Sequence, residues 1–100
     1  MDNKLDFEQV NKTALFNLST ILARWLPDGQ VQGAEYIARN PRRADRKPGS
    51  FKINMNSGKW SDFATGDAGG DVISLTAYLA GLGQADAARN LAEMLGVKND

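Results

Sequence analysis

The chain has 100 residues, 42% of them hydrophobic and 24% charged, and its twelve basic residues are balanced by twelve acidic ones. These totals are typical of one globular domain, and we expect residues 1–100 to form it. The chain contains no cysteine and no histidine, which excludes disulfide bonds and metal sites built from thiolates or imidazoles. It has no apolar run of membrane-spanning length and no signal peptide, so we expect a cytoplasmic protein with no membrane partner.

The N-terminal 27 residues are predicted to form a helix. Apolar residues recur there at spacings of three and four, which places them along one side of a helix. Asp6 and Asn11 are both candidate N-caps, and Pro27-Asp28-Gly29 ends the pattern. The apolar stripe consists of Ala14, Leu15, Leu18, Ile21, Leu22, Trp25 and Leu26.

Residues 34–64 are predicted to form a small antiparallel sheet. A short strand is expected over 34–39, and strict alternation of apolar and polar residues indicates another over 50–56. The turn at Asn56-Ser57-Gly58 predicts a hairpin, with its return strand over 59–64. The alternation directs Phe51, Ile53 and Met55 to one face, and Trp60 and Phe63 are expected to face apolar neighbours.

Residues 71–96 are predicted to form a pair of helices. Asp71 follows two glycines and is a good N-cap for the first helix, which Gly81 and Gly83 are expected to end. Gly96 stands in the C-cap position of the second helix. With the N-terminal helix and the sheet, this pair predicts an α+β fold.

The glycine-rich stretch "TGDAGGD" (65–71) suggests a phosphate-binding loop, but no Gly-Lys-Ser/Thr sequence follows it. Its aspartates would also repel an anion. Asp62, Asp67 and Asp71 are too widely spaced for a calcium loop, and no Glu closes one. The simpler interpretation of this stretch is a turn followed by a helix cap, and we expect no cofactor and no catalysis from this chain alone.

Basic residues are concentrated between Arg39 and Lys52. Six basic residues and one acidic residue give this segment a net charge of +5, which leaves −5 for the rest of the chain. A basic patch with nearby aromatic residues is typical of a surface that binds nucleic acid. The alternatives are a solvated charged loop and aromatic residues that belong to the core. The candidate binding residues are Arg42, Arg43, Arg46, Lys47, Lys52, Lys59 and Trp60.

Two stretches, "NPRRADRKPGSF" (40–51) and "GKWSDFATGDAGGDVISL" (58–75), resemble the N-terminal zinc-ribbon domain of bacterial DNA primases and phage primase–helicases. The helices after them, in "AYLAGLGQADAARNLAEMLGV", are similar to the helix-turn-helix that follows this ribbon in the family. The resemblance covers 39–97. The four zinc ligands of the family fall on Asn40, Arg43, Asp62 and Thr65. Because structural zinc requires thiolate or imidazole donors, the resemblance implies the shape of the domain without the metal.

By this resemblance, the chain would be a nucleic-acid-binding, template-recognition module at the N-terminus of a phage, plasmid or mobile-element primase–helicase-like protein in DNA replication. Its expected partners are single-stranded DNA and the downstream primase or helicase domains. The alternative is a metal-free protein-interaction or structural module that has lost DNA binding. We expect the N-terminal helix to pack on the sheet in compensation for the metal, and Arg43 to form an ion pair with Asp62.

Overall fold

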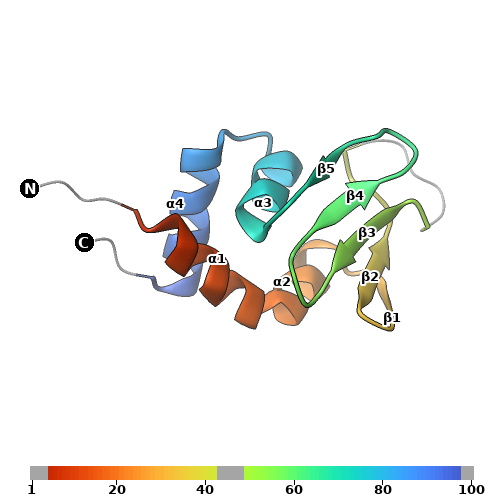
Figure 1. Cartoon of the computed structure of the whole chain (residues 1–100), viewed down its shortest axis with the longest axis horizontal. Coiled ribbons are helices and arrows are strands. Elements are labelled where there is room, and N and C mark those ends of the chain that lie inside the picture. Colours follow the sequence, from red (N-terminus) through yellow and green to blue (C-terminus); the bar gives the residue numbers. More distant parts are fainter. Residues whose placement is uncertain (1–4, 43–48, 98–100) are drawn as a thin grey trace, which may run out of the picture.

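The computed structural model describes residues 5–42 and 49–97 and has the α+β fold that the sequence predicts (Figure 1). A group of helices lies at one end of the molecule and a twisted antiparallel sheet at the other. The elements in chain order are α1 (Phe7–Phe16), α2 (Leu18–Trp25), β1 (Gln30–Gln32), β2 (Glu35–Ala38), β3 (Phe51–Asn54), β4 (Trp60–Asp62), β5 (Ala68–Gly69), α3 (Val72–Ala80) and α4 (Gln84–Leu95).

The predicted N-terminal helix is divided into two. Asp6 caps α1, since its side chain accepts a hydrogen bond from the backbone N–H of Gln9. At Asn17 the helix breaks, and the Asn17 side-chain amide donates to the carbonyl of Thr13 at 2.8 Å. Asparagine competes in this way for backbone hydrogen bonds, which explains why the helix ends and restarts there.

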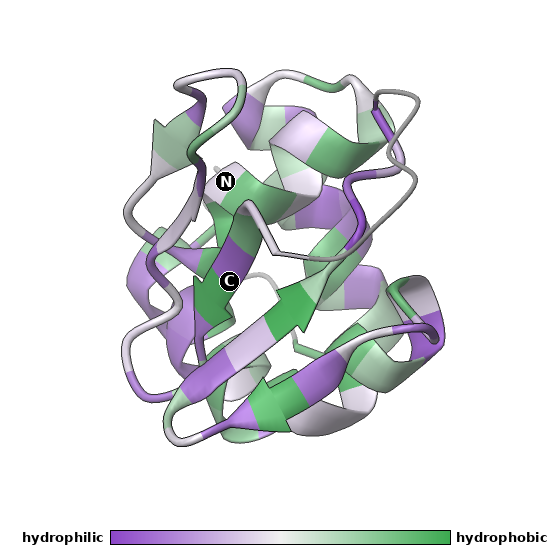
Figure 2. Ribbon diagram, turned by 90° about the vertical axis from the view of Figure 1, so that its right-hand side faces the viewer, coloured by the Kyte–Doolittle hydropathy of each residue, from purple (hydrophilic) through white to green (hydrophobic). Residues whose placement is uncertain are grey.

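The sheet has five strands in the order β1-β2-β3-β4-β5, and every neighbouring pair is antiparallel. The alternation predicted for β3 is confirmed, because Phe51 and Ile53 are buried while Lys52 and Asn54 are only half-buried. The sequence did not indicate β1 and β5, which are three and two residues long. Figure 2 shows the resulting mixture of hydrophobic and hydrophilic positions along the strands.

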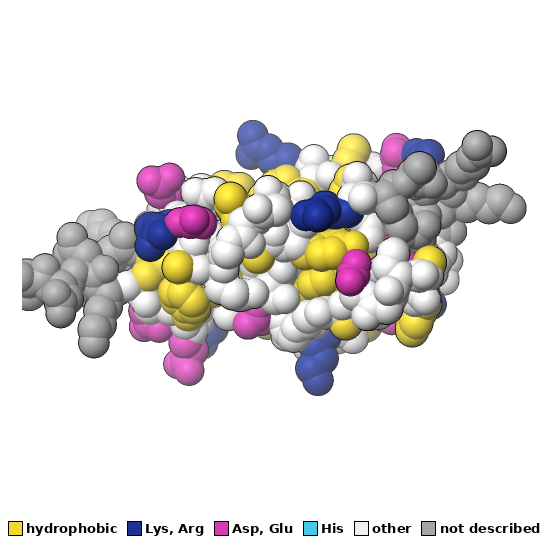
Figure 3. Space-filling view, turned by 90° about the horizontal axis from the view of Figure 1, so that it is seen from above, with side chains coloured by type: hydrophobic (Ala, Val, Ile, Leu, Met, Phe, Trp, Pro, Cys, Tyr) yellow, Lys and Arg dark blue, Asp and Glu magenta, His cyan; other side chains and the backbone are white. Residues whose placement is uncertain are grey.

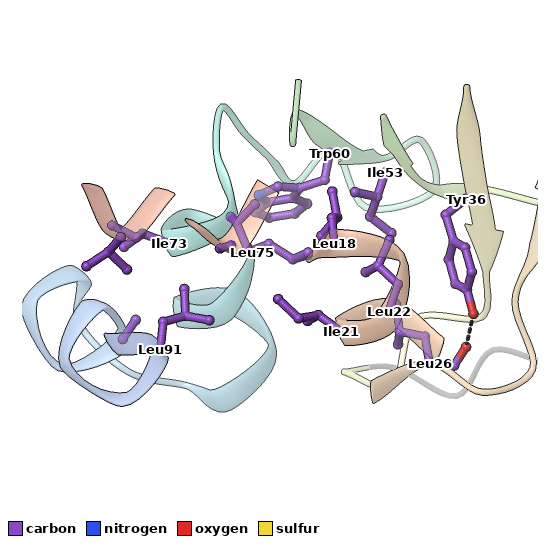
Figure 4. Close-up of a cluster of buried hydrophobic side chains, with 14 of the residues drawn as sticks. Leu18, Ile21, Leu22, Leu26, Tyr36, Ile53, Trp60, Ile73, Leu75 and Leu91 are labelled. Carbon is purple, nitrogen blue, oxygen red and sulfur yellow. Dashed lines mark hydrogen bonds between the residues drawn. The ribbon is translucent and has the colours of Figure 1, made fainter. Parts of the chain in front are cut away.

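The core lies between the sheet and the helices. Figure 4 shows Ile53 and Trp60 pointing from the sheet toward Leu18 and Leu22, which come from α2. All four side chains are buried. The second half of the predicted N-terminal helix, α2, therefore packs against the sheet, whereas α1 packs against α3 and α4.

The two C-terminal helices have the predicted caps, with one correction. Asp71 caps α3 by accepting from the backbone N–H of Ser74 at 2.7 Å. Gly81 and Gly96 are the left-handed C-caps of α3 and α4. Gly83, expected to end α3, is instead the N-cap residue of α4.

Phe63 is the clearest error in the predicted core. Phe63 is 73% exposed, because it follows β4 and the strand alternation places it on the face opposite buried Trp60 and Asp62. Within the described parts of the chain, no helix is long and apolar enough to cross a membrane.

Candidate nucleic-acid interface

Asn40 and Asp62 are two of the four positions at which the resemblance places zinc ligands, and the fold brings their side chains together. Both are buried, and the Asn40 side-chain amide donates a hydrogen bond of 2.8 Å to Asp62 Oδ2. The two residues are separated by 22 positions in the sequence. Asn40 follows Arg39, just after β2, and Asp62 is the last residue of β4.

Each of these residues also organises the loop that follows it. Asn40 Oδ1 accepts from the backbone N–H of Arg42, and Asp62 Oδ1 accepts from that of Ala64, both at 2.8 Å. Asn and Asp side chains characteristically make this bond to the backbone two residues further on. Two such turns therefore face each other, joined by the amide–carboxylate bond between Asn40 and Asp62.

Tyr78 extends this hydrogen-bonded group to α3. Its hydroxyl accepts from the Asn40 side-chain amide at 2.8 Å and donates to Asp67 Oδ2 at 2.9 Å. Asn40, Asp62 and Tyr78 are called the polar clasp below. The polar clasp links the end of β2, the end of β4 and α3.

The residues at the ligand positions do not fit a structural zinc ion. Asn40 offers an amide oxygen, which already accepts from the backbone N–H of Arg42, and Asp62 offers two carboxylate oxygens, which already accept from the Asn40 side-chain amide and the backbone N–H of Ala64. Thr65 Oγ1 accepts from the backbone N–H of Asp67 at 3.1 Å. Among the described residues, no group of three or more acidic side chains could hold a metal ion. Arg43, and with it the expected Arg43–Asp62 ion pair, lies outside the described residues.

Arg42 is held against the polar clasp. Its guanidinium donates to the backbone carbonyl of Tyr78 at 2.8 Å and lies over the Tyr78 ring, 5.4 Å from the ring centroid. The side chain is nevertheless exposed. Arg42 is therefore a fixed positive charge at the surface, whereas Arg39 forms an ion pair with Asp28.

Trp60 belongs to the core, as the alternative interpretation of the aromatic residues requires. It is only 5% exposed, meets Phe51 edge-on at 6.1 Å between ring centroids and lies 4.6 Å from the Tyr78 ring. A base could not stack on a ring that is covered in this way. Phe63 is the exposed aromatic residue of this region.

Lys52 and Lys59 lie on the side of the sheet that faces away from Phe51 and Ile53. Lys52 Nζ is 5.6 Å from the centroid of the Phe63 ring, so a positive charge and an exposed aromatic ring lie side by side. Together with their neighbours they surround a hollow of about 320 Å³. We call this surface the open face; its lining residues are Glu35, Lys52, Asn54, Lys59, Trp60, Ser61, Phe63 and Gly69.

The predicted basic residues therefore divide into separate groups. Arg42 lies beside α3, while Lys52 and Lys59 lie on the open face. Arg43, Arg46 and Lys47 lie outside the described residues. Figure 3 shows that basic and acidic side chains are interspersed on the upper face of the molecule rather than gathered into a field of one sign.

Sequence reasoning missed two features of this region. The exposure of Phe63 was missed because Trp60 and Phe63 were both assigned to apolar neighbours, although residues three apart in a strand face opposite sides. The role of Tyr78 was missed because its hydroxyl meets residues 38 and 11 positions away, and no local pattern marks such contacts.

No protein-family model matches the chain, and no curated protein matches it. Among solved structures, the chain is similar to the crystal structure of the Aquifex aeolicus primase, comprising its zinc-binding and RNA polymerase domains. The TM-score is 0.76 and the sequence identity 20%; the match covers 97% of this chain but only 22% of that primase chain. The chain therefore has the fold of a primase zinc-binding domain.

This similarity extends over more of the chain than the sequence resemblance, which began at residue 39. With 97% of the chain covered, the N-terminal helices are included. They have counterparts in a protein described as zinc-binding, so they are part of the shared fold. The expectation that they compensate for the absence of the metal stays a prediction.

Proposed function

We propose that this chain is a nucleic-acid-binding module of a primase-like protein, and that its ligand is single-stranded DNA. The observation that carries the proposal is the exposed Phe63 ring beside Lys52 on the open face. Proteins that bind single strands combine basic residues for the phosphates with aromatic rings on which bases stack. The fold of a primase zinc-binding domain supports this assignment.

The proposed parent is a phage, plasmid or mobile-element primase–helicase-like protein acting in DNA replication in the cytoplasm. The match to only 22% of the Aquifex primase chain is consistent with a role as one module among several. In this proposal the module binds the template, and the active sites for primer synthesis and unwinding belong to other domains. The supporting observation within this chain is the motif resemblance over residues 39–97.

Titration with a fluorescently labelled oligonucleotide at several salt concentrations tests the proposal. If four phosphates are neutralised on a single strand, log K should fall against log salt with a slope of about −2.8. The variant R42E/R43E/R46E removes the basic cluster, and K52E/K59E reverses the charges of the open face. Each should greatly weaken binding.

The matched control for K52E/K59E is K12E/R89E, which changes the net charge equally on α1 and α4. It should reduce affinity only through long-range repulsion and therefore by much less. A wild-type chain that fails to bind single-stranded DNA at low salt would overturn the proposed function.

A second candidate function is that of a protein-interaction or structural module. The observation that favours it is an apolar hollow of about 300 Å³ between α2, α3 and α4, lined among others by Trp25, Leu79 and Met94. Under this alternative, R42E/R43E/R46E would leave the activity of the parent protein nearly unchanged. Under the first proposal the same variant would abolish template binding.

A further inference from the structure

We propose that the polar clasp performs without metal the joining that a bound ion performs in zinc-binding domains of this fold, and that it thereby positions Arg42. The second part rests on the proposed function, because Arg42 is one of the residues proposed to bind nucleic acid. The fold is that of a zinc-binding domain, but the donor atoms at the ligand positions do not fit zinc.

Asn40 and Asp62 meet directly where the family's zinc ligands would converge. A structural metal ion holds several loops together through side chains that converge on one point. Here two of the corresponding side chains converge on each other at 2.8 Å in a buried environment. A charge-assisted hydrogen bond of this kind is roughly twice as strong as a neutral one. The pair therefore provides a direct link between the ends of β2 and β4.

The side-chain polar atoms of Asn40 and Asp62 have further hydrogen-bond partners. A buried polar pair is useful only when its remaining donors and acceptors also have partners. Both Asn40 Nδ2 bonds are present, one to Asp62 and one to Tyr78. Asn40 Oδ1 accepts from Arg42, and Asp62 Oδ1 accepts from Ala64. The clasp is thus a connected network whose parts depend on one another.

Arg42 is connected to the polar clasp. Its backbone N–H is bound by Asn40, its guanidinium donates to the Tyr78 carbonyl, and the same guanidinium lies over the Tyr78 ring. Two of the three clasp residues therefore fix both ends of this residue. Fixing a long side chain in advance reduces the entropy that is lost on binding a polyanion.

The experiment compares five variants in the full chain. N40D places two carboxylates at hydrogen-bond distance, where they repel each other. N40D/D62N exchanges the partners and restores an amide–carboxylate pair. D62N and Y78F are milder changes for the case in which N40D does not fold.

The fifth variant, N11D, is the matched control. Asn11 also donates to an aspartate, Asp71, at 3.2 Å, and this pair joins α1 to α3 away from the clasp. N11D therefore also places two carboxylates at hydrogen-bond distance, in a half-buried setting and without touching Arg42. It separates a general loss of stability from a local release of Arg42.

Two measurements are made on each variant. The first is hydrogen exchange of the Arg42 backbone amide, followed by NMR. The same NMR spectra give the chemical shifts of the Arg42 side chain, which respond to the nearby Tyr78 ring. The second is affinity for a labelled oligo-dT strand. We expect N40D to accelerate exchange at Arg42 and to weaken binding, each roughly 10-fold or more, as the loss of one charge-assisted hydrogen bond would. The exchanged pair should restore both, Y78F should show smaller effects in the same direction, and N11D should show neither.

Unchanged hydrogen exchange at Arg42 in both N40D and Y78F would overturn the proposal that the polar clasp positions Arg42. Equal effects of N11D and N40D on exchange and affinity would overturn it as well. Release of Arg42 without loss of affinity would show that the clasp does not serve binding and would leave the proposed function intact. If the wild-type chain did not bind oligo-dT, the proposed function would fail, and the exchange measurement would still decide whether the clasp holds Arg42.

Discussion

Tyr36 Oη donates a hydrogen bond of 2.7 Å to the backbone carbonyl of Leu26, and this bond is buried. It joins β2 to the residue that ends α2, as Figure 4 shows. Burial, and to a lesser extent the negative charge of Asp28, raises the pKa of Tyr36 above its ordinary value.

The variant Y36F should therefore lose about 0.5–1.5 kcal/mol of unfolding free energy at pH 7, the net contribution of one hydrogen bond. Above about pH 10 the unfolded phenol ionises before the folded one. Protons are then lost on unfolding, so wild-type stability falls as the pH rises through this range. Urea unfolding between pH 8 and 11 should show that the difference in unfolding free energy between wild type and Y36F narrows as the pH rises. Lysine titration is common to both proteins and cancels in this difference. A constant difference would contradict this account.

Replacement of Gly69 by alanine should destabilise the fold by about 1–3 kcal/mol, because a Cβ there would lie 2.4 Å from Trp60 Nε1 and 2.0 Å from Ser74 Oγ. The neighbouring Gly70 is the control, since a Cβ at that position meets nothing within 4 Å. In thermal unfolding, G69A should have a clearly lower melting temperature than G70A. Equal melting temperatures would show that β5 moves freely away from Trp60.

Truncation of Leu22 to alanine should cost about 2–5 kcal/mol, the usual cost of removing a buried leucine side chain. Leu22 is completely buried between α2 and the sheet, whereas Val31 on the edge strand β1 is largely exposed. Val31→Ala is therefore the control and should change stability by less than about 1 kcal/mol. Denaturant unfolding measures both; a small effect of Leu22→Ala would mean that α2 contributes little to the core.

Phe63→Ala should weaken binding to single-stranded DNA by about 1–3 kcal/mol, the usual contribution of one stacked base. Its stability should be nearly unchanged, because the side chain is 73% exposed. Phe16→Ala is matched to it, since Phe16 is 90% exposed but lies at the end of α1. Fluorescence anisotropy should show weaker binding for the first variant alone. Equal affinities of the two variants would remove Phe63 from the proposed site.

Chelation with EDTA should leave the melting temperature of the chain unchanged, because Asn40, Asp62 and Thr65 do not provide a structural zinc site. Scanning calorimetry with and without EDTA, combined with elemental analysis of the purified chain, measures this. A melting temperature that drops on chelation and returns with zinc would show that the domain depends on a metal ion, which would contradict the proposed role of the polar clasp.

Local patterns in the sequence predicted much of the fold correctly. The alternation around Phe51 and Ile53, the Asp71 cap and the left-handed Gly96 cap depend on neighbours within a few residues, so each is visible in a short window. Motif resemblance then pointed to the primase zinc-binding fold, which the structural similarity confirms. The short strands β1 and β5 were missed because two or three residues are too few to show a period.

The arrangement of the candidate site depends mainly on tertiary structure. From the sequence alone, Asn40 and Asp62 were positions where zinc ligands were absent, and Trp60 was a candidate for base stacking. Folding buries Trp60, exposes Phe63 and brings Asn40 to Asp62 across 22 residues. The sequence determined which chemical groups the domain has, and the lack of cysteine and histidine excluded metal sites built from thiolates or imidazoles. Which of these groups meet one another depends on long-range packing that no local pattern encodes.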